Sequence, residues 1–361
     1  MKSQYNIRKL TAIVSILFLS TVIWAQDEYT REIQKDYPVN ANTRLEIYNK
    51  YGNVDVVNHD QSSILIRVTI KVHARDKAKA DVLLNKIDVD FSQQGDVIKA
   101  VTEITEDIHR YFKGVYSSDG GFQINYSVTI PKTLPVVLSN KYGNVFIDEL
   151  VSTSTIDVKY GKLTANKIIH DSKQPLTKIN LSYSTGSIQE TRWIEADIKY
   201  SKLSLTENKA LAIISKYSKL YLTNGSSIVS ESKYDTYEID NLSNFVSNAA
   251  YSHFKIGKLT GKLQVDTKYT EVFVDRIPSG FEGIKVNNSY GTYKLGIDPS
   301  ASYKINAYSK YASIIYPEKS ARVNRINENN EMKINGIIGN EESAKYEVII
   351  NSSYGTIRLI D

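Results

Sequence analysis

Apolar and polar residues alternate along most of this chain, in short stretches arranged around tyrosines. Four residues before a tyrosine the position is usually apolar, as at Ile47, Leu138 and Ile213, and two residues before it the position is mostly small or polar. Apolar residues return three and five positions after the tyrosine, as at Leu203 and Leu205. Because a strand places alternate residues on opposite faces, each side of the tyrosine predicts a β-strand with one inward face.

The two strands of each unit are out of phase by one residue. Inward positions are even offsets before the tyrosine and odd offsets after it, so the pleat must shift near the tyrosine. The residue that follows the tyrosine is usually glycine or serine, as at Gly52, Gly143 and Ser201. A small residue fits a bulge or corner, where one extra residue reverses the side-chain parity. We therefore expect strand, corner, strand and turn in each unit.

This unit is an internal repeat, which should be recognised before any local prediction. After a first copy at Tyr51, the tyrosines at the centres of the units are Tyr142, Tyr160, Tyr183, Tyr200, Tyr217, Tyr234, Tyr251, Tyr269, Tyr290, Tyr311 and Tyr354. Steps of 17 to 23 residues separate Tyr142 from Tyr311, and four consecutive steps are 17 residues. The last step of 43 residues predicts one layer that lacks its tyrosine, around residues 332–338.

Steps of this length are too short for a crossover helix in each repeat. They predict an all-β fold, a single-chain β-solenoid (β-helix) of 17–21-residue coils, in which equivalent residues stack about 4.8 Å apart. The 26 tyrosines, against 9 phenylalanines, then predict a structural ladder of rings whose hydroxyl groups reach water or backbone. A platform on which carbohydrate stacks is the alternative interpretation.

The chain between Tyr51 and Tyr142 lacks the repeat and predicts a different structure. Residues 64–72 alternate as a long strand, and Ala80, Leu83, Leu84 and Ile87 form the stripe of an amphipathic helix with Asp76 as its N-cap. Further strands are expected around residues 89–91, 97–104 and 122–130. We expect a β-rich N-terminal cap with one helix, covering an end of the solenoid. Residues 105–121 predict a loop whose aromatic residues could contact a partner.

The first residues predict export. Lys2, Arg8 and Lys9 precede an apolar run over residues 10–24, which is shorter than the ~20 residues that span a bilayer. With the small Ala25 after it, this is typical of a cleavable signal peptide, residues 1–25; an uncleaved N-terminal anchor is the alternative. The cap is then residues 26–135 and the tyrosine-repeat solenoid residues 136–361. We expect a periplasmic or extracellular protein with no transmembrane span after cleavage.

Composition excludes several classes of function. Without residues 1–25, 42 basic residues face 40 acidic ones, so the charge gives little support to binding of nucleic acid, which needs a clustered basic face. The chain has no cysteine, which excludes disulfides, thiolate metal sites and a cysteine nucleophile. The five histidines form no metal-binding pair, and no motif for phosphate binding or serine hydrolysis occurs. We expect no metal, no cofactor and no catalytic residue.

Carboxylates recur three residues before the tyrosine, at Asp157, Asp197, Glu231 and Asp266. They accompany lysines on the same outward face, which is typical of exposed ion pairs worth about 0–1 kcal/mol each. A glycosidase needs two carboxylates in a special setting, and regular repetition argues against one. We therefore expect no enzyme, with a polysaccharide-active β-helix enzyme as the alternative.

Lysine directly precedes the tyrosine in eight of the twelve units, which predicts a basic ridge on the outside of the corner. The candidate polyanion-contact residues are Lys159, Lys162, Lys199, Lys202, Lys216 and Lys219. Like charges on neighbouring coils repel one another, so an acidic glycan or another envelope component is a plausible partner. Pairing with Asp157 and Asp197, and protection of a repetitive β surface from aggregation, is the other interpretation.

The chain also resembles a known family. Strand, Tyr-Gly and strand over residues 44–56, the helix near residues 76–88, the strand end at residues 128–131 and the repeated Tyr-Gly units are similar to the bacterial "putative adhesin" β-solenoid domains of unknown function. The resemblance covers about residues 40–361. It implies an exported, non-enzymatic, adhesin-like binding or scaffolding protein of the cell envelope, and it transfers no functional residue. A periplasmic partner in envelope signalling is a further alternative.

Overall fold

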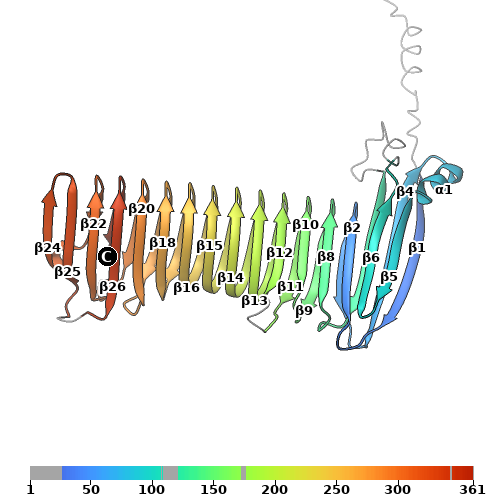
Figure 1. Ribbon diagram of the computed structural model, residues 1–361, viewed down its shortest axis with the longest axis horizontal. Helices are drawn as coiled ribbons and strands as arrows, with labels where there is room; N and C mark the ends of the chain where they lie inside the picture. The colour runs from blue at the N-terminus through green and yellow to red at the C-terminus, as the bar shows by residue number, and fades with distance from the viewer. Residues whose placement is uncertain (1–26, 107, 109–120, 172–175, 342–343, 361) are drawn as a thin grey trace, which may run out of the picture.

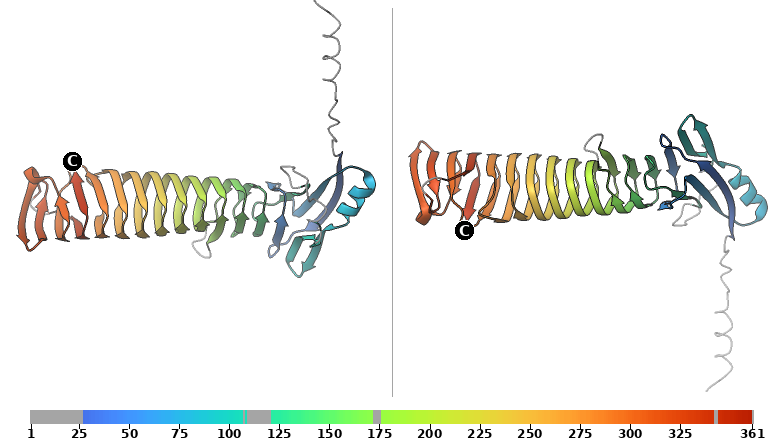
Figure 2. Two further views of the ribbon diagram at one scale, coloured as in Figure 1. Left: turned by 90° about the horizontal axis from the view of Figure 1, so that it is seen from above. Right: turned by 90° about the horizontal axis from the view of Figure 1, so that it is seen from below.

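The computed structural model describes residues 27–106, 108, 121–171, 176–341 and 344–360. Within them the chain is nearly all-β, with one α-helix, α1 (Lys77–Leu84), and a long array of strands (Figure 1). The views in Figure 2 show an elongated stack, with α1 and the first strands gathered at one end. The predicted signal peptide and most of the predicted loop at residues 105–121 lie outside the described residues.

The strands that precede each tyrosine form one parallel row. In spatial order it begins with β2 (Arg44–Lys50), β8 (Val136–Lys141), β10 (Thr155–Lys159) and β12 (Thr177–Ser182). It continues through the second halves of β13 (Thr185–Lys199), β14 (Lys202–Lys216), β15 (Lys219–Lys233) and β16 (Thr236–Ala250), then β18 (Lys262–Lys268) and β20 (Gly283–Ser289). Equivalent residues of successive units are therefore hydrogen-bonded neighbours.

The strands that follow each tyrosine form a second parallel row. It contains β3 (Val54–Asn58), β9 (Val145–Leu150), β11 (Lys162–Ile168), the first halves of β13 to β16, β17 (His253–Leu259), β19 (Glu271–Ile277) and β21 (Thr292–Ile297). The core comprises the inward residues of both rows, including Ile213, Leu203 and Leu205. Ser230 and Ser247 replace the apolar residue in two layers; both are buried, and the Ser230 hydroxyl donates to Ser247 Oγ at 2.7 Å.

The tyrosine itself makes the corner. All twelve repeat tyrosines have φ between 50° and 63°, the left-handed region that L-residues other than asparagine and aspartate seldom occupy. The glycine after the tyrosine is explained by lack of space rather than by backbone conformation. A Cβ on Gly143 would lie 1.9 Å from the Gly52 carbonyl oxygen. In the glycine units the expected bulge thus involves two residues, a tyrosine with the unusual backbone and a glycine with no room for a side chain. Other units have a serine or a larger residue after the tyrosine, as at Ser201 and Asp235.

The last strands lie inside the stack rather than at its end (Figure 1). From β21 the chain continues to β22 (Tyr303–Lys310) and β23 (Ser313–Ile315), makes the 3-10 turn η3 (Glu318–Ser320) and forms an antiparallel hairpin of β24 (Ala321–Glu328) and β25 (Glu331–Ile338) on β22. It then returns, and β26 (Tyr346–Ser353) pairs between β20 and β22 while β27 (Thr356–Ile360) pairs between β21 and β23.

The prediction of a layer without its tyrosine around residues 332–338 is therefore wrong. Those residues belong to β25, which caps one row by antiparallel pairing with β22. The layer between Tyr290 and Tyr311 is present, and Tyr354 from the end of the chain completes it.

The other end of the stack carries mostly antiparallel strands. β4 (Ser63–Ala74) pairs with β1 (Asp27–Pro38) and β7 (Phe122–Ile130), and β5 (Ile87–Gln94) pairs with β6 (Val97–Ile104). β6 and β7 also pair in parallel with β2 and β3, which joins this part to the stack.

The predicted helix of the N-terminal part is present in a shorter form. Asp76 is its N-cap, and its side chain accepts from Lys79 N at 2.8 Å, as the sequence predicted. The helix ends at Leu84, so Ile87, which was expected on its apolar stripe, belongs to β5 instead. The unit of Tyr51 pairs directly with that of Tyr142. The boundary near residue 135 stays a prediction.

Candidate ligand-contact surface

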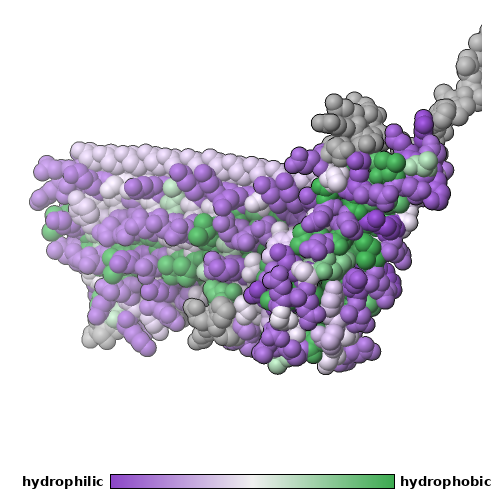
Figure 3. Space-filling model, turned by 45° about the vertical axis from the view of Figure 1, so that its right-hand side comes forward, coloured by the Kyte–Doolittle hydropathy of each residue, from purple (hydrophilic) through white to green (hydrophobic). Residues whose placement is uncertain are grey.

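The twelve repeat tyrosines form one continuous row of stacked rings, called here the tyrosine row. Neighbouring ring centroids are 4.8–5.1 Å apart, and neighbouring planes differ by 2–19°. The row follows one edge of the stack, visible as a continuous band of intermediate hydropathy in Figure 3. This regular spacing follows from the parallel register, which places each tyrosine beside its equivalent.

Interior rings of the row have no free face. Tyr217, for example, lies 5.0 Å from the ring of Tyr200 on one side and 4.8 Å from that of Tyr234 on the other. Although the rings are 39–51% exposed, stacked neighbours cover both faces and leave ring edges and hydroxyl groups to solvent. A carbohydrate platform, which requires an open aromatic face, is therefore incompatible with the interior of the row.

Lysines line both sides of the tyrosine row near its middle. Before the tyrosine, Lys199, Lys216 and Lys233 are in register in three consecutive layers, and after it Lys202 pairs in register with Lys219. We call these five residues the basic strip. Equivalent residues in adjacent layers are about 4.8 Å apart along the stack, so the strip concentrates positive charge on one surface.

The structure brings together only part of the predicted ridge. Lys159 and Lys162 are separated from the basic strip by the layer of Tyr183, which has Ser182 and Thr185 at the equivalent positions. Lys233, absent from the six predicted residues, belongs to the strip. The repeat could have identified it, since it precedes a tyrosine as Lys199 and Lys216 do.

Most of the strip has no acidic partner. Lys199 lies 3.0 Å from Asp197, but the next layer has Ile214 at the position of Asp197. Within the described residues no carboxylate lies within 4.0 Å of the ammonium groups of Lys202, Lys216, Lys219 and Lys233. Lys202 lies over the ring of Tyr221 at 4.4 Å, and Lys216 and Lys233 each lie 5.5 Å from the centroid of the tyrosine that follows.

A shallow groove of about 470 Å³ runs beside the tyrosine row at the same place. Its lining includes the edges of Tyr200 and Tyr217 together with Lys202 and Lys219. It therefore offers cations and phenol hydroxyl groups along one line, which can contact an extended anionic chain more readily than a compact small molecule.

The four carboxylates that come three residues before a tyrosine are spaced so that no two of them are neighbours. Along the register, Asn180 separates Asp157 from Asp197 and Ile214 separates Asp197 from Glu231; Asn248 then separates Glu231 from Asp266. Burial raises the pKa of Asp157 above its ordinary value, and Lys159 opposes this shift. These acids thus follow the repeat, with a neutral side chain between each pair.

Across residues 27–360, apart from the gaps given above, no three histidine or acidic side chains are grouped closely enough to hold a metal ion. None of the described helices has the length and apolar character needed to cross a membrane.

Comparison with known proteins gives similar solved structures. A structure from Clostridium sporogenes, described as a putative cell adhesion protein, is 12% identical with a TM-score of 0.20, and the match covers 92% of this chain and 99% of that one. Structures described as putative adhesins come from Parabacteroides distasonis (9% identity, TM-score 0.31, 73% and 97% covered) and Bacteroides fragilis (14% identity, TM-score 0.24, 91% and 97% covered).

No protein-family model matches the chain, and a search of curated proteins found no match. These three structures are described as putative adhesins or a putative cell adhesion protein, as the resemblance in the sequence indicated, and a further one from Parabacteroides distasonis is described as a putative lipid binding protein. At these TM-scores they carry no argument about ligand or mechanism.

Proposed function

We propose that this chain is an exported, non-enzymatic binding protein of the cell envelope, built as a β-solenoid, whose basic strip binds a linear acidic polymer such as an acidic glycan. The solenoid interpretation is supported by the two parallel rows, because each unit contributes one strand to each row and then advances by one layer. Such a stack presents an identical position every layer, which suits a ligand that is itself a repeating chain.

The observation that carries the proposal is the unpaired charge of the strip. Lys202, Lys216, Lys219 and Lys233 lie on consecutive layers without a carboxylate within 4.0 Å in the described chain. Neighbouring cations at this spacing repel one another, and a polyanion laid along the row would convert that repulsion into attraction. Binding of this kind is expected to be weak and sensitive to salt, because exposed charges are screened.

The spacing of the acids supports a non-enzymatic role. Hydrolysis of a glycosidic bond uses two carboxylates placed on either side of that bond, one of them with a raised pKa. Here Asp157 has a raised pKa through burial, but its neighbours in the register are Ser139 and Asn180. No second acid stands beside it in its row.

Charge substitution on the strip tests the proposal. A variant with Lys202, Lys216, Lys219 and Lys233 all replaced by glutamine removes no ion pair of the described chain, so its fold should persist. Its affinity for immobilised polygalacturonate at low salt should fall by about tenfold or more, and its elution should depend less on salt.

The matched control changes the same number of charges elsewhere. Lys258, Lys285, Lys294 and Lys304 are exposed lysines outside the strip, and their replacement by glutamine should leave retention nearly unchanged. Equal loss in both variants would mean that net charge alone controls retention. Unchanged retention of the strip variant would leave the lysines with only a role in preventing aggregation.

A further inference from the structure

The two ends of the tyrosine row differ. At one end the ring of Tyr51 is covered by Phe122, whose centroid lies 5.3 Å away at an angle of 60°. At the other end Tyr311 contacts one ring of the row, that of Tyr354 at 5.1 Å. The side of Tyr311 that faces away from Tyr354 is therefore not covered by another ring of the row.

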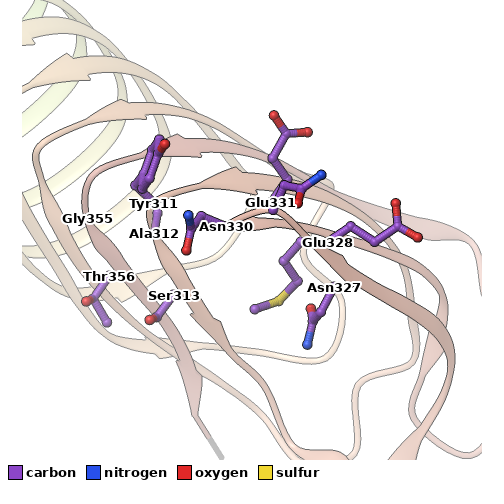
Figure 4. Close-up of a pocket in the computed structure, with 11 residues that line it drawn as sticks. Tyr311, Ala312, Ser313, Asn327, Glu328, Asn330, Glu331, Gly355 and Thr356 are labelled. Carbon is purple, nitrogen blue, oxygen red and sulfur yellow. The ribbon is translucent and has the colours of Figure 1, made fainter.

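Tyr311 lines a hollow of about 660 Å³ between the last layer and the β24–β25 hairpin (Figure 4). The hollow exists because the hairpin pairs with β22 and so extends only one of the two rows. In the second row β23 pairs with β27 alone among the described strands. Where the next strand of that row would lie, the structure has an open space instead.

Backbone contacts fix the far wall of the hollow. Tyr311 N donates to the Asn330 carbonyl oxygen at 2.8 Å, so the hairpin turn is tied to the base of the ring. Asn329 and Asn330 have φ of 49° and 62°, as a two-residue hairpin turn requires, and asparagine tolerates this conformation. The ring and the turn are therefore held at a defined separation before any ligand arrives.

The lining suits a neutral, hydroxyl-rich ligand. In Figure 4, Tyr311, Asn330, Ser313 and Thr356 lie on one side and Asn327 on the other, which gives part of an aromatic ring, two hydroxyl groups and two amides. Hydroxyl and amide groups both donate and accept hydrogen bonds. Pockets with an aromatic wall and a few fixed polar groups are typical small-molecule sites.

Charge at the rim argues against an anionic ligand. The carboxylates of Glu328 and Glu331 point away from Ser313 and Thr356 (Figure 4). No lysine or arginine is among the lining residues, and the nearby Lys310 is paired with Glu331 at 3.2 Å. This end of the row is thus chemically distinct from the basic strip.

We propose that the hollow beside Tyr311 binds one neutral sugar residue, which packs against the exposed part of the Tyr311 side chain while Ser313, Thr356, Asn327 and Asn330 bond its hydroxyl groups. This site is separate from the polyanion surface and does not depend on it. A neutral residue at the end of a glycan chain, or a short neutral oligosaccharide, presents this chemistry.

The test uses the full chain and three probes: cellobiose, maltose and N,N′-diacetylchitobiose. Titration calorimetry measures affinity, and saturation-transfer NMR identifies the sugar protons that contact the protein. We expect at least one probe to bind equally well at low and high salt. Tyr311→Ala should weaken its binding by about tenfold or more, the order found when a stacking aromatic is removed. Thr356→Val, which keeps the shape of the side chain, should weaken it less.

Tyr183→Ala is the matched control, since Tyr183 and Tyr311 are both 51% exposed and Tyr183 is interior to the row. Its binding should equal that of the unmodified chain. The proposal is overturned if no probe binds, if Tyr183→Ala and Tyr311→Ala weaken binding equally, or if Thr356→Val has no effect. Loss of binding in the lysine-to-glutamine strip variant would also overturn it, because the sugar would then occupy the basic strip.

Discussion

The rings of Tyr290 and Tyr354 lie 4.8 Å apart with planes 4° from parallel, although Tyr311 is the next repeat tyrosine along the chain. Tyr354 is consequently an interior member of the row, with Tyr290 on one face and Tyr311 on the other. Sequence order alone would make it the last.

This order predicts the relative cost of two substitutions. Tyr354→Ala removes two ring contacts and Tyr311→Ala removes one, and each such contact is worth about 0.5–1.5 kcal/mol. We expect Tyr354→Ala to lower the melting temperature more, by the equivalent of about 1 kcal/mol. A thermal melt followed by circular dichroism measures both, and a milder effect of Tyr354→Ala would contradict the observed order of the layers.

Gly143, which follows Tyr142, is required by lack of space. A Cβ on Gly143 would lie 1.9 Å from the Gly52 carbonyl oxygen, and only movement of main chain in two layers could relieve this. Gly143→Ala should therefore destabilise the protein by about 3 kcal/mol. A Cβ on Gly280 meets nothing within 4 Å, so Gly280→Ala should leave the melting temperature nearly unchanged. Equal effects would show that the layers can separate freely.

The sequence predicted the layers well because each layer repeats the same physical requirement. Inward positions such as Ile213 and Leu203 must be apolar to form the core, and the parity change at the tyrosine is visible as a phase shift in that pattern. The helix cap at Asp76 was also predictable, since its side chain satisfies a local backbone donor.

The order of the last layers could not be predicted, because the repeated pattern is the same in every layer. Every unit presents similar edges, so β26 can pair with β20 and β22 as well as any other unit could. The hollow beside Tyr311 depends on that order and on the hairpin, and no residue pattern marks it. The gap between Lys159 and Lys199 was predictable, because a serine, Ser182, precedes Tyr183 where the neighbouring units have a lysine.

The left-handed backbone at Tyr217, where φ is 52°, predicts that the glycine variant at this position is at least as stable as the alanine variant. Tyr217→Ala loses two ring contacts and should cost about 2–3 kcal/mol, less than for a fully buried ring, because Tyr217 is 44% exposed. Tyr217→Gly removes more atoms, yet glycine adopts this φ without the penalty of about 1–2 kcal/mol that alanine has. We expect the glycine variant to melt at or above the temperature of the alanine variant.

Tyr217→Phe is the control, since it keeps both ring contacts. It should stay within about 0.5 kcal/mol of the unmodified chain, as exposed substitutions usually do. A phenylalanine variant as unstable as the alanine variant would show that the hydroxyl group, rather than stacking, holds the row together.

Absence of glycosidase activity is a separate prediction. Residues 26–361, incubated with acidic and neutral polysaccharides, should release no reducing sugar and no unsaturated product, because Asp157, Asp197, Glu231 and Asp266 are separated from one another by neutral residues in the register. Turnover that disappears on replacing one of these carboxylates, but survives replacement of a lysine in the basic strip, would establish an enzyme.

Burial of Asp157 predicts a defined dependence of stability on pH. Its pKa in the folded protein lies above the ordinary value of 3.8, because burial disfavours the charged carboxylate more than Lys159 favours it. An acid whose pKa is raised on folding stabilises the fold while it is protonated, and this contribution is lost as the pH rises through the folded pKa. Asp157→Asn should therefore raise the melting temperature near neutral pH, and the gain should disappear below about pH 3.8.

Asp266→Asn is the matched control, since Asp266 is exposed and lies between Asn248 and Asn287 in the same register. A gain of equal size at Asp266, or a gain at Asp157 that persists in acid, would refute burial as the cause.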